Sequence, residues 1–160
     1  MTALQRSVQG RPIIIRRLFV VADDAIPHPI QEVARVAFDL SRPVWKTTHG
    51  LVLVSTGNDF YPRVTLESWT KPIAEPPPDQ TWEDLGPFDV SVPVGRVWIE
   101  HADGPKVGEP LLLPPGDYGG RVFRWTSDAV PYEDDLDDEA PEQAVEEWLI
   151  RFWRHSSADV

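Results

Sequence analysis

The stretch Glu109–Trp125 constrains the fold more than any other part of the sequence. An apolar triplet, Leu111–Leu113, precedes the residues Pro-Pro-Gly-Asp at 114–117, and an extended run follows at 118–125. Proline fixes φ and glycine supplies the conformations of a tight reversal, so the chain must turn here. The valine, phenylalanine and tryptophan after the turn favour a strand, and the paired glycines disfavour a helix. The stretch therefore predicts a strand, a turn and a second strand.

Proline limits the rest of the chain in the same way. Seventeen of the 160 residues are proline, about twice the usual share. Because proline is excluded from helix interiors and central strand positions, the chain must be built from many short elements. A hydrophobic content of 41% with seven tryptophans excludes wholesale disorder. The length predicts a single domain over residues 1–160.

Two elements are predicted near the N-terminus. The β-branched run Arg11–Val21 indicates a first strand, with a bend or an edge position because Arg16 and Arg17 cannot both face a core. Between Pro29 and Leu40, apolar residues recur at helical spacing, and proline suits the first turn of a helix. We expect one short amphipathic helix near residues 29–40, with its apolar stripe in the core.

The middle of the chain returns to a β pattern. Residues Gly50–Trp69 contain two apolar or alternating runs around a turn cluster, which predicts a β-hairpin with a long loop. The proline-rich residues Lys71–Asp79 are interpreted as a stiff connector that crosses between sheets. Two further strands, separated by Pro93-Val94-Gly95, are expected within Gly86–Glu100. Such regular spacing is typical of a sandwich or barrel.

The C-terminal part fits two interpretations. As a helix from Pro141, it has an apolar stripe through Trp148 and Phe152; as a strand, Trp148, Ile150 and Phe152 share one face. Propensity favours strand after Glu147. We predict a final strand near 147–153 that pairs with the strand at 118–125.

Together these elements predict an all-β fold. It is expected to be a two-layer antiparallel β-sandwich of about seven to eight strands, with the one short helix near residues 29–40.

Charge is distributed unevenly along the sequence. Residues 1–80 hold nine Lys and Arg against eight Asp and Glu, whereas residues 81–160 hold six against eighteen. The net charge of the whole chain is −11. An acidic surface repels nucleic acid and attracts basic partners. Direct binding of DNA or RNA is therefore not expected.

The densest acidic stretch is the candidate partner-binding site. Its contact residues are predicted to be carboxylates together with two aromatic anchors: Tyr132, Glu133, Asp134, Asp135, Asp137, Asp138, Glu139, Glu142, Glu146 and Trp148. Calcium is disfavoured because these aspartates come in adjacent pairs without the glycine of an EF-hand loop. The competing interpretation is a solvated loop that only keeps a sheet edge soluble.

No catalytic or cofactor signature is present. The chain has no cysteine, and its four histidines are too scattered to suggest a zinc site. No nucleophile elbow or phosphate loop occurs. We expect no enzyme, no cofactor and no metal. Without a signal peptide or a membrane span, a cytoplasmic protein is the default expectation.

Exposed tryptophans support an alternative function. Trp69, Trp82, Trp98, Trp125 and Trp153 are candidates for a platform on which a glycan or another small ligand would stack. Aromatic residues spaced along strands also serve as core, so this alternative competes with a purely structural role.

The order of elements resembles the competence protein J family, small acidic bacterial proteins known as inhibitors of the nuclease of DNA uptake. The matching pieces are the strand Ile14–Asp23, the helix Pro29–Phe38, the hairpin Gly50–Trp69, the block Pro87–Glu100 and, as the nearest match, Leu111–Tyr118 with Leu-Pro-Pro-Gly-Asp-Tyr. The resemblance covers most of the chain and implies a nuclease inhibitor. It carries over no set of binding residues.

The charge pattern and the resemblance predict the same function. A nuclease presents a basic cleft to phosphates, and an acidic protein can occupy that cleft in place of DNA. We therefore expect a non-enzymatic inhibitor or immunity-type protein that masks a basic protein, with a nuclease as the favoured partner. The sequence names neither the partner nor the oligomeric state.

Overall fold

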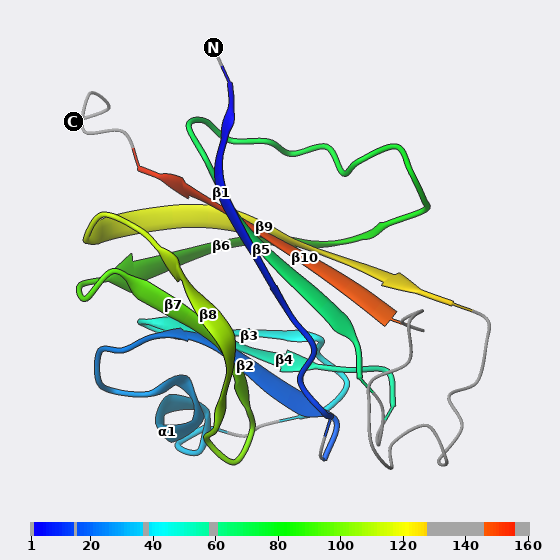
Figure 1. The fold of residues 1–160 in the computed structure, drawn as a ribbon. Coiled ribbons are helices and arrows are strands. Elements are labelled where there is room, and N and C mark those ends of the chain that lie inside the picture. The colour runs from blue at the N-terminus through cyan, green and yellow to red at the C-terminus, as the bar shows by residue number, and fades with distance from the viewer. Residues whose placement is uncertain (1, 15, 37–38, 58–60, 128–145, 156–160) are drawn as a thin grey trace.

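The computed structural model describes residues 2–14, 16–36, 39–57, 61–127 and 146–155 (Figure 1). These residues form two stacked β-sheets and one helix, α1 (Pro29–Val33). The first sheet, sheet A, has the order β1 (Leu4–Gly10), β5 (Arg63–Trp69), β10 (Glu146–Arg154), β9 (Gly116–Thr126), β6 (Glu83–Val92). The second sheet, sheet B, has the order β3 (Val44–Lys46), β4 (Gly50–Val54), β2 (Leu18–Asp23), β7 (Arg96–His101), β8 (Lys106–Leu112).

The predicted all-β sandwich is confirmed, with differences in detail. The described residues contain ten strands, more than the expected seven or eight. One addition is β1, whose sequence Leu-Gln-Arg-Ser-Val-Gln-Gly is too polar to signal a strand. It forms because it pairs along β5 at the edge of sheet A. All pairs are antiparallel except β5 with β10, which run parallel.

The β-hairpin predicted over Gly50–Trp69 is wrong, because the chain passes from one sheet to the other between its two strands. β4 and β5 lie in different sheets, as do β6 and β7, and β8 and β9. At the β6–β7 corner, the Asp23 carboxylate accepts hydrogen bonds from the amides of Val94, Gly95 and Arg96 at 3.2, 2.9 and 3.1 Å. A side chain thus satisfies donors that a hairpin would have paired across its strands.

The β8–β9 corner is the turn that the sequence predicts at residues 114–117. The Tyr118 hydroxyl donates a hydrogen bond to the Pro114 carbonyl at 2.6 Å, the arrangement of a tyrosine corner. Pro114 and Pro115 have no amide hydrogen to add to a ladder. The turn was predicted correctly, and the pairing of its two strands was not.

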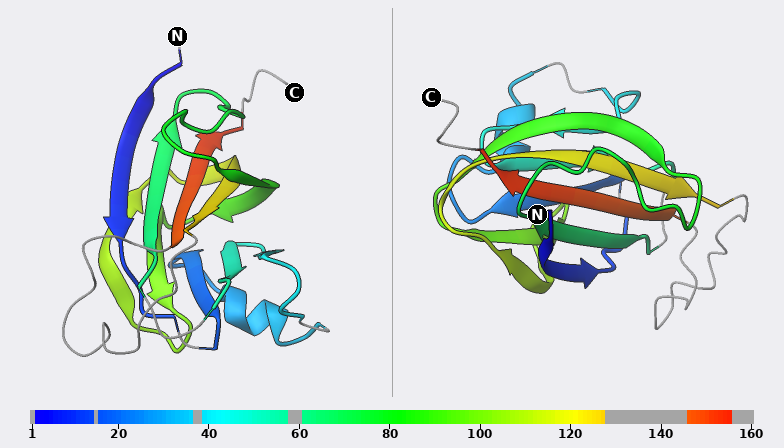
Figure 2. Two further views of the ribbon diagram at one scale, coloured as in Figure 1. Left: turned by 90° about the vertical axis from the view of Figure 1, so that its right-hand side faces the viewer. Right: turned by 90° about the horizontal axis from the view of Figure 1, so that it is seen from above.

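The proline-rich connector also differs from expectation. It leaves β5 and returns to β6 within sheet A, so it does not cross between sheets. It passes over the outer face of β10 and β9 (Figure 2), where Phe123 and Leu149 are buried. The Arg151 guanidinium donates to the carbonyls of Ile73 and Glu75. These bonds hold the connector against the sheet.

The N-terminal predictions are corrected in their boundaries. The strand expected at Arg11–Val21 begins only at Leu18, because Arg16 and Arg17 adopt positive φ angles of 57° and 66° and form a turn. The helix expected near 29–40 spans only Pro29–Val33. Its N-cap is His28, whose ring accepts a hydrogen bond from the Ile30 amide at 3.2 Å. As predicted, its apolar stripe is buried: Val33 packs with Val20, Trp45 and Val52 on the outer face of sheet B.

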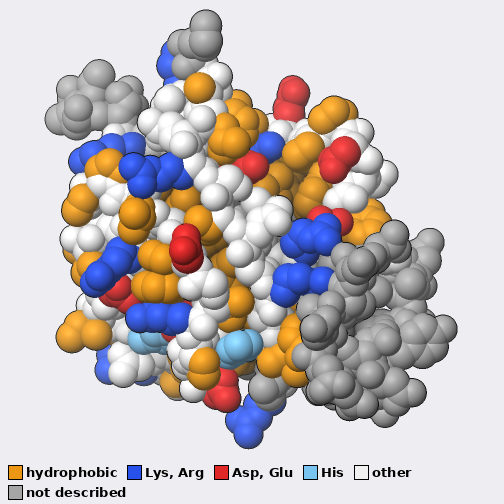
Figure 3. Space-filling model, in the orientation of Figure 1, with side chains coloured by type: hydrophobic (Ala, Val, Ile, Leu, Met, Phe, Trp, Pro, Cys, Tyr) orange, Lys and Arg blue, Asp and Glu red, His pale blue; other side chains and the backbone are white. Residues whose placement is uncertain are grey.

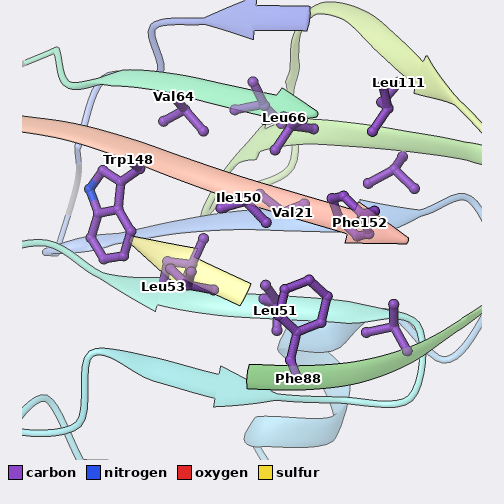
Figure 4. Packing of buried hydrophobic residues seen from close by; sticks show 14 of the residues in the cluster. Val21, Leu51, Leu53, Val64, Leu66, Phe88, Leu111, Trp148, Ile150 and Phe152 are labelled. Atoms are coloured by element: carbon purple, nitrogen blue, oxygen red, sulfur yellow. The ribbon is translucent and has the colours of Figure 1, made fainter. Parts of the chain in front are cut away.

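The final strand is confirmed. β10 pairs antiparallel with β9, with Glu147 opposite Trp125 and Trp153 opposite Gly119. Its inner face carries Trp148, Ile150 and Phe152, which point toward Val21, Leu51 and Leu53 of sheet B (Figure 4). Edge-to-face ring pairs join Trp148 to Phe19 at 5.2 Å and Phe152 to Phe88 at 5.3 Å between centroids.

A glycine next to this ring pair is expected to be irreplaceable. A Cβ at Gly120 would collide with the Arg151 carbonyl of the neighbouring strand and with the Phe88 ring. We predict that Gly120→Ala lowers the free energy of unfolding by about 3 kcal/mol or more, measured by urea denaturation.

The adjacent Gly119→Ala is the matched control. Its Cβ would meet Trp153 Nε1 at 3.0 Å and His155 Cε1 at 3.2 Å, both at the ends of side chains that can shift. We expect a loss below about 1 kcal/mol. Equal losses in the two variants would contradict the packing described for Gly120.

Candidate partner-binding site

Most of the net negative charge of the chain comes from one segment. Residues 128–145 contain eight Asp and Glu and no Lys or Arg. The residues that the structure describes hold all fifteen Lys and Arg against sixteen Asp and Glu. The two-sheet body is thus close to neutral, and the segment 128–145, here called the acidic segment, carries most of the excess.

Carboxylates of the body are paired with the chain's own cations. Asp24 contacts Arg96 and Lys106, both at 2.9 Å, and Glu83 contacts Arg124 at 2.9 Å. On the face seen in Figure 3, acidic and basic side chains of the described residues are interspersed. These pairs leave the body without an acidic field of its own over that face.

Asp84 shows how strongly such a pair holds its charge. Burial raises the pKa of Asp84, but the hydrogen bond and charge of Arg121 together with the Gly86 amide lower it more, so the net pKa lies below the ordinary value. The Arg121 guanidinium contacts Asp84 at 2.9 Å. Asp84 is therefore ionised at neutral pH and already matched by a cation.

The two strands that flank the acidic segment in the sequence are paired. β9 ends at Thr126 and β10 begins at Glu146, and these two residues are opposite one another in the β9–β10 ladder. The end of the sandwich from which the segment departs is therefore defined by two paired strands.

Glu146, one of the predicted contact residues, is an anchor at this point. Its side chain is fully buried and accepts hydrogen bonds from Ser55 Oγ at 2.8 Å, Thr56 N at 3.1 Å, Thr56 Oγ1 at 2.5 Å and Trp148 Nε1 at 2.6 Å. Ser55 and Thr56 directly follow β4 of the other sheet. The carboxylate therefore ties β10 to sheet B and faces no partner.

Trp148, the second predicted contact residue that the structure describes, is also buried. Only 1% of its surface is exposed. Its ring packs against Phe19, and the Arg124 guanidinium lies 5.4 Å from its centroid. We therefore leave Glu146 and Trp148 out of the contact surface proposed below. The other predicted contact residues lie outside the described residues: Tyr132, Glu133, Asp134, Asp135, Asp137, Asp138, Glu139 and Glu142.

The tryptophans of the glycan hypothesis do not form one platform. Trp69, Trp125 and Trp153 lie on the outer face of sheet A, opposite its core-facing residues. Trp98 lies on the outer face of sheet B, with Lys106 Nζ 4.9 Å from its ring centroid. Trp82 precedes β6 and donates to Asp79 at 3.2 Å. Trp69 and Trp153 are partners in the β5–β10 ladder, whereas Trp98 lies on the opposite side of the sandwich. The five rings are thus divided between the two sheets and form no single platform.

The described residues contain neither a metal-ligand cluster nor a membrane-spanning helix. In that part of the chain, no three His, Asp or Glu side chains converge as metal ligands. A helix of the kind that spans a bilayer is likewise absent from it.

Comparison with solved structures shows what this architecture is similar to. ComJ from Bacillus subtilis, an inhibitor of the DNA-degrading activity of NucA, matches over 97% of this chain and 99% of its own, with a TM-score of 0.53 and 16% sequence identity. The fold resembles that of a nuclease inhibitor. This likeness agrees with the resemblance that the sequence suggested.

The other comparisons add little. The product of crocagin biosynthetic gene J matches over 98% of this chain and 99% of its own, with a TM-score of 0.49 and 18% identity. No protein-family model matches the sequence, and a search of curated proteins finds no match.

The anchoring role of Glu146 predicts a large stability effect. Glu146→Gln keeps the shape of the side chain but turns an amide toward donors, which leaves buried groups unpaired. We expect a loss of about 2–3 kcal/mol in the free energy of unfolding, measured by urea denaturation.

The neighbouring Glu147→Gln serves as the control. Glu147 pairs with Arg63 at 3.4 Å in a partly exposed position, so its loss should cost below about 1 kcal/mol. If Glu146→Gln proved as harmless as this control, the anchor assignment would be wrong.

Proposed function

We propose that this protein is a non-enzymatic inhibitor or immunity-type protein that masks the basic site of another protein, with a nuclease as the favoured partner. The observation that carries the proposal is the concentration of eight carboxylates, with no Lys or Arg among them, in the segment between two paired strands of a nearly neutral body. The proposed contact residues are Tyr132 and the seven carboxylates Glu133, Asp134, Asp135, Asp137, Asp138, Glu139 and Glu142.

The physical basis is charge complementarity. A nuclease must attract phosphates, so its cleft carries a positive potential that also attracts clustered carboxylates. Such complementarity raises the association rate and makes it sensitive to salt. Tyr132, in the same segment, supplies the aromatic group that stable interfaces commonly use as an anchor.

The likeness to ComJ supports the same class of function by analogy. ComJ inhibits the DNA-degrading activity of a nuclease, and the shared fold provides a comparable scaffold. Because a fold hosts many functions, the weight of the proposal rests on the charges of this chain. A cytoplasmic setting and the absence of direct nucleic-acid binding are part of the proposal.

Affinity capture from the native host tests the proposal. The immobilised protein is expected to retain a basic protein at about 50 mM salt and to release most of it at about 500 mM, because the Debye length shortens several-fold. The captured protein is then purified and assayed for nuclease activity with increasing amounts of the inhibitor.

A charge-matched pair of variants locates the contact. Changing Asp134, Asp135, Asp137 and Asp138 to Asn should slow association with the captured partner by about tenfold or more, measured by surface plasmon resonance. The control changes four exposed carboxylates of the body, Glu75, Asp103, Glu109 and Asp117, to their amides. It alters the net charge equally and should have a much smaller effect. Equal effects, salt-independent capture or recovery of acidic partners would count against the proposal.

A further inference from the structure

β1 begins and β10 ends at the other end of the sandwich (Figure 1). A cleft of about 730 Å³ lies there, and its walls come from the start of β1, the end of β5, the β8–β9 corner and the end of β10. Glu146 and Arg154 stand at opposite ends of the nine-residue strand β10. At roughly 3.3 Å per residue, about 25 Å separates the cleft from the acidic segment's attachment.

The cleft carries positive charge in a chain whose net charge is −11. Arg6 and Arg154 line it, and among the described residues no Asp or Glu does. Arg154 donates to the Pro115 carbonyl at 3.0 Å. Within the described residues, neither guanidinium has a carboxylate partner. This contrasts with the arginines on β9, which are matched by acids.

A serine hydroxyl contributes to the lining of the cleft. Ser68 lines the cleft, and within the described residues its hydroxyl makes no side-chain hydrogen bond. The hydroxyl can therefore donate a hydrogen bond to a ligand in the cleft.

Tyr118 also lines the cleft. Burial raises the pKa of Tyr118, an effect that the nearby Arg154 charge opposes in part. Its phenol is thus neutral, and its hydroxyl donates a hydrogen bond to the Pro114 carbonyl. The phenol oxygen is held in place and adds no negative charge to the cleft.

The remaining lining of the cleft mixes apolar and polar side chains. Leu113 and Pro114 contribute apolar surface, and Leu112, which also lines the cleft, is 46% exposed. Gln5 and Thr70 contribute polar groups.

We propose that this cleft binds a small organic carboxylate with an apolar body. Guanidinium groups bind carboxylates with strong, directional hydrogen bonds, and the Ser68 hydroxyl supplies a further donor. Leu112, Leu113 and Pro114 would cover the apolar part. The volume lies within the range of small-molecule sites, which combine apolar walls with a few polar groups. The proposal does not depend on the inhibitor function.

Titration with 3-phenylpropanoate, followed by ¹H–¹⁵N NMR of the full chain, tests the site. We expect saturable shifts at the amides of Ser68, Trp69, Tyr118 and Arg154. The uncharged isostere 3-phenylpropanamide should bind at least about tenfold more weakly, because it forfeits the charge-assisted bonds. Equal binding of the amide, or no saturable shift at these residues, would overturn the proposal.

Three variants sharpen the result. Arg6→Gln combined with Arg154→Gln should weaken binding of 3-phenylpropanoate by about tenfold or more, whereas Arg35→Gln, an equally exposed arginine after α1, should leave it unchanged. Ser68→Ala should weaken binding without lowering the melting temperature, because the hydroxyl has no partner to lose. Unchanged affinity in the double variant, measured alongside an unchanged circular dichroism spectrum, would refute the site.

Discussion

The insertion of β10 between β5 and β9 is the interaction on which the rest of the structure depends. Without it, sheet A would consist of two separate pairs, β1 with β5 and β9 with β6. The strand also places Trp148, Ile150 and Phe152 in the centre of the core. Its partners lie far apart in sequence, so the sheet closes only when the last strand docks. Glu146 then joins the start of this strand to the residues after β4.

The same strand separates two regions of opposite charge. Its first residue, Glu146, directly follows the acidic segment, and its last residue, Arg154, lines the cationic cleft. Between them, several carboxylates of the body are paired with arginines, as Asp84 is with Arg121. Most of the net charge of the molecule lies in the acidic segment. The electric field of that segment acts locally, because salt screens it within about 10 Å.

Part of the candidate site was readable from the sequence, and part was not. The run of carboxylates at 133–139 is visible to any count of charges. The burial of Glu146 and Trp148 could not be predicted from the sequence. A glutamate next to such a run has the same sequence signature as its exposed neighbours, and only the structure shows its partners Ser55 and Thr56. The one sequence feature that indicates the burial of Glu146 is its place in the strand. At the two-residue period of a strand, Glu146 shares the inner face with Trp148 and Ile150. The cleft at Ser68 had no signal, since its lining residues are spread from Gln5 to Arg154.

The sequence alone determined the β class, the turns and the final strand, because alternation of apolar residues and proline or glycine chemistry act over a few residues. Tertiary structure decided which strands pair. The turns at 93–95 and 114–117 looked like hairpins, but each joins two sheets, since the Asp23 carboxylate and the Tyr118 hydroxyl complete their hydrogen bonds. The tertiary structure also decided which acidic residues pair with which arginines. Local sequence sets how a chain bends, and only the packed core sets which distant side chains meet.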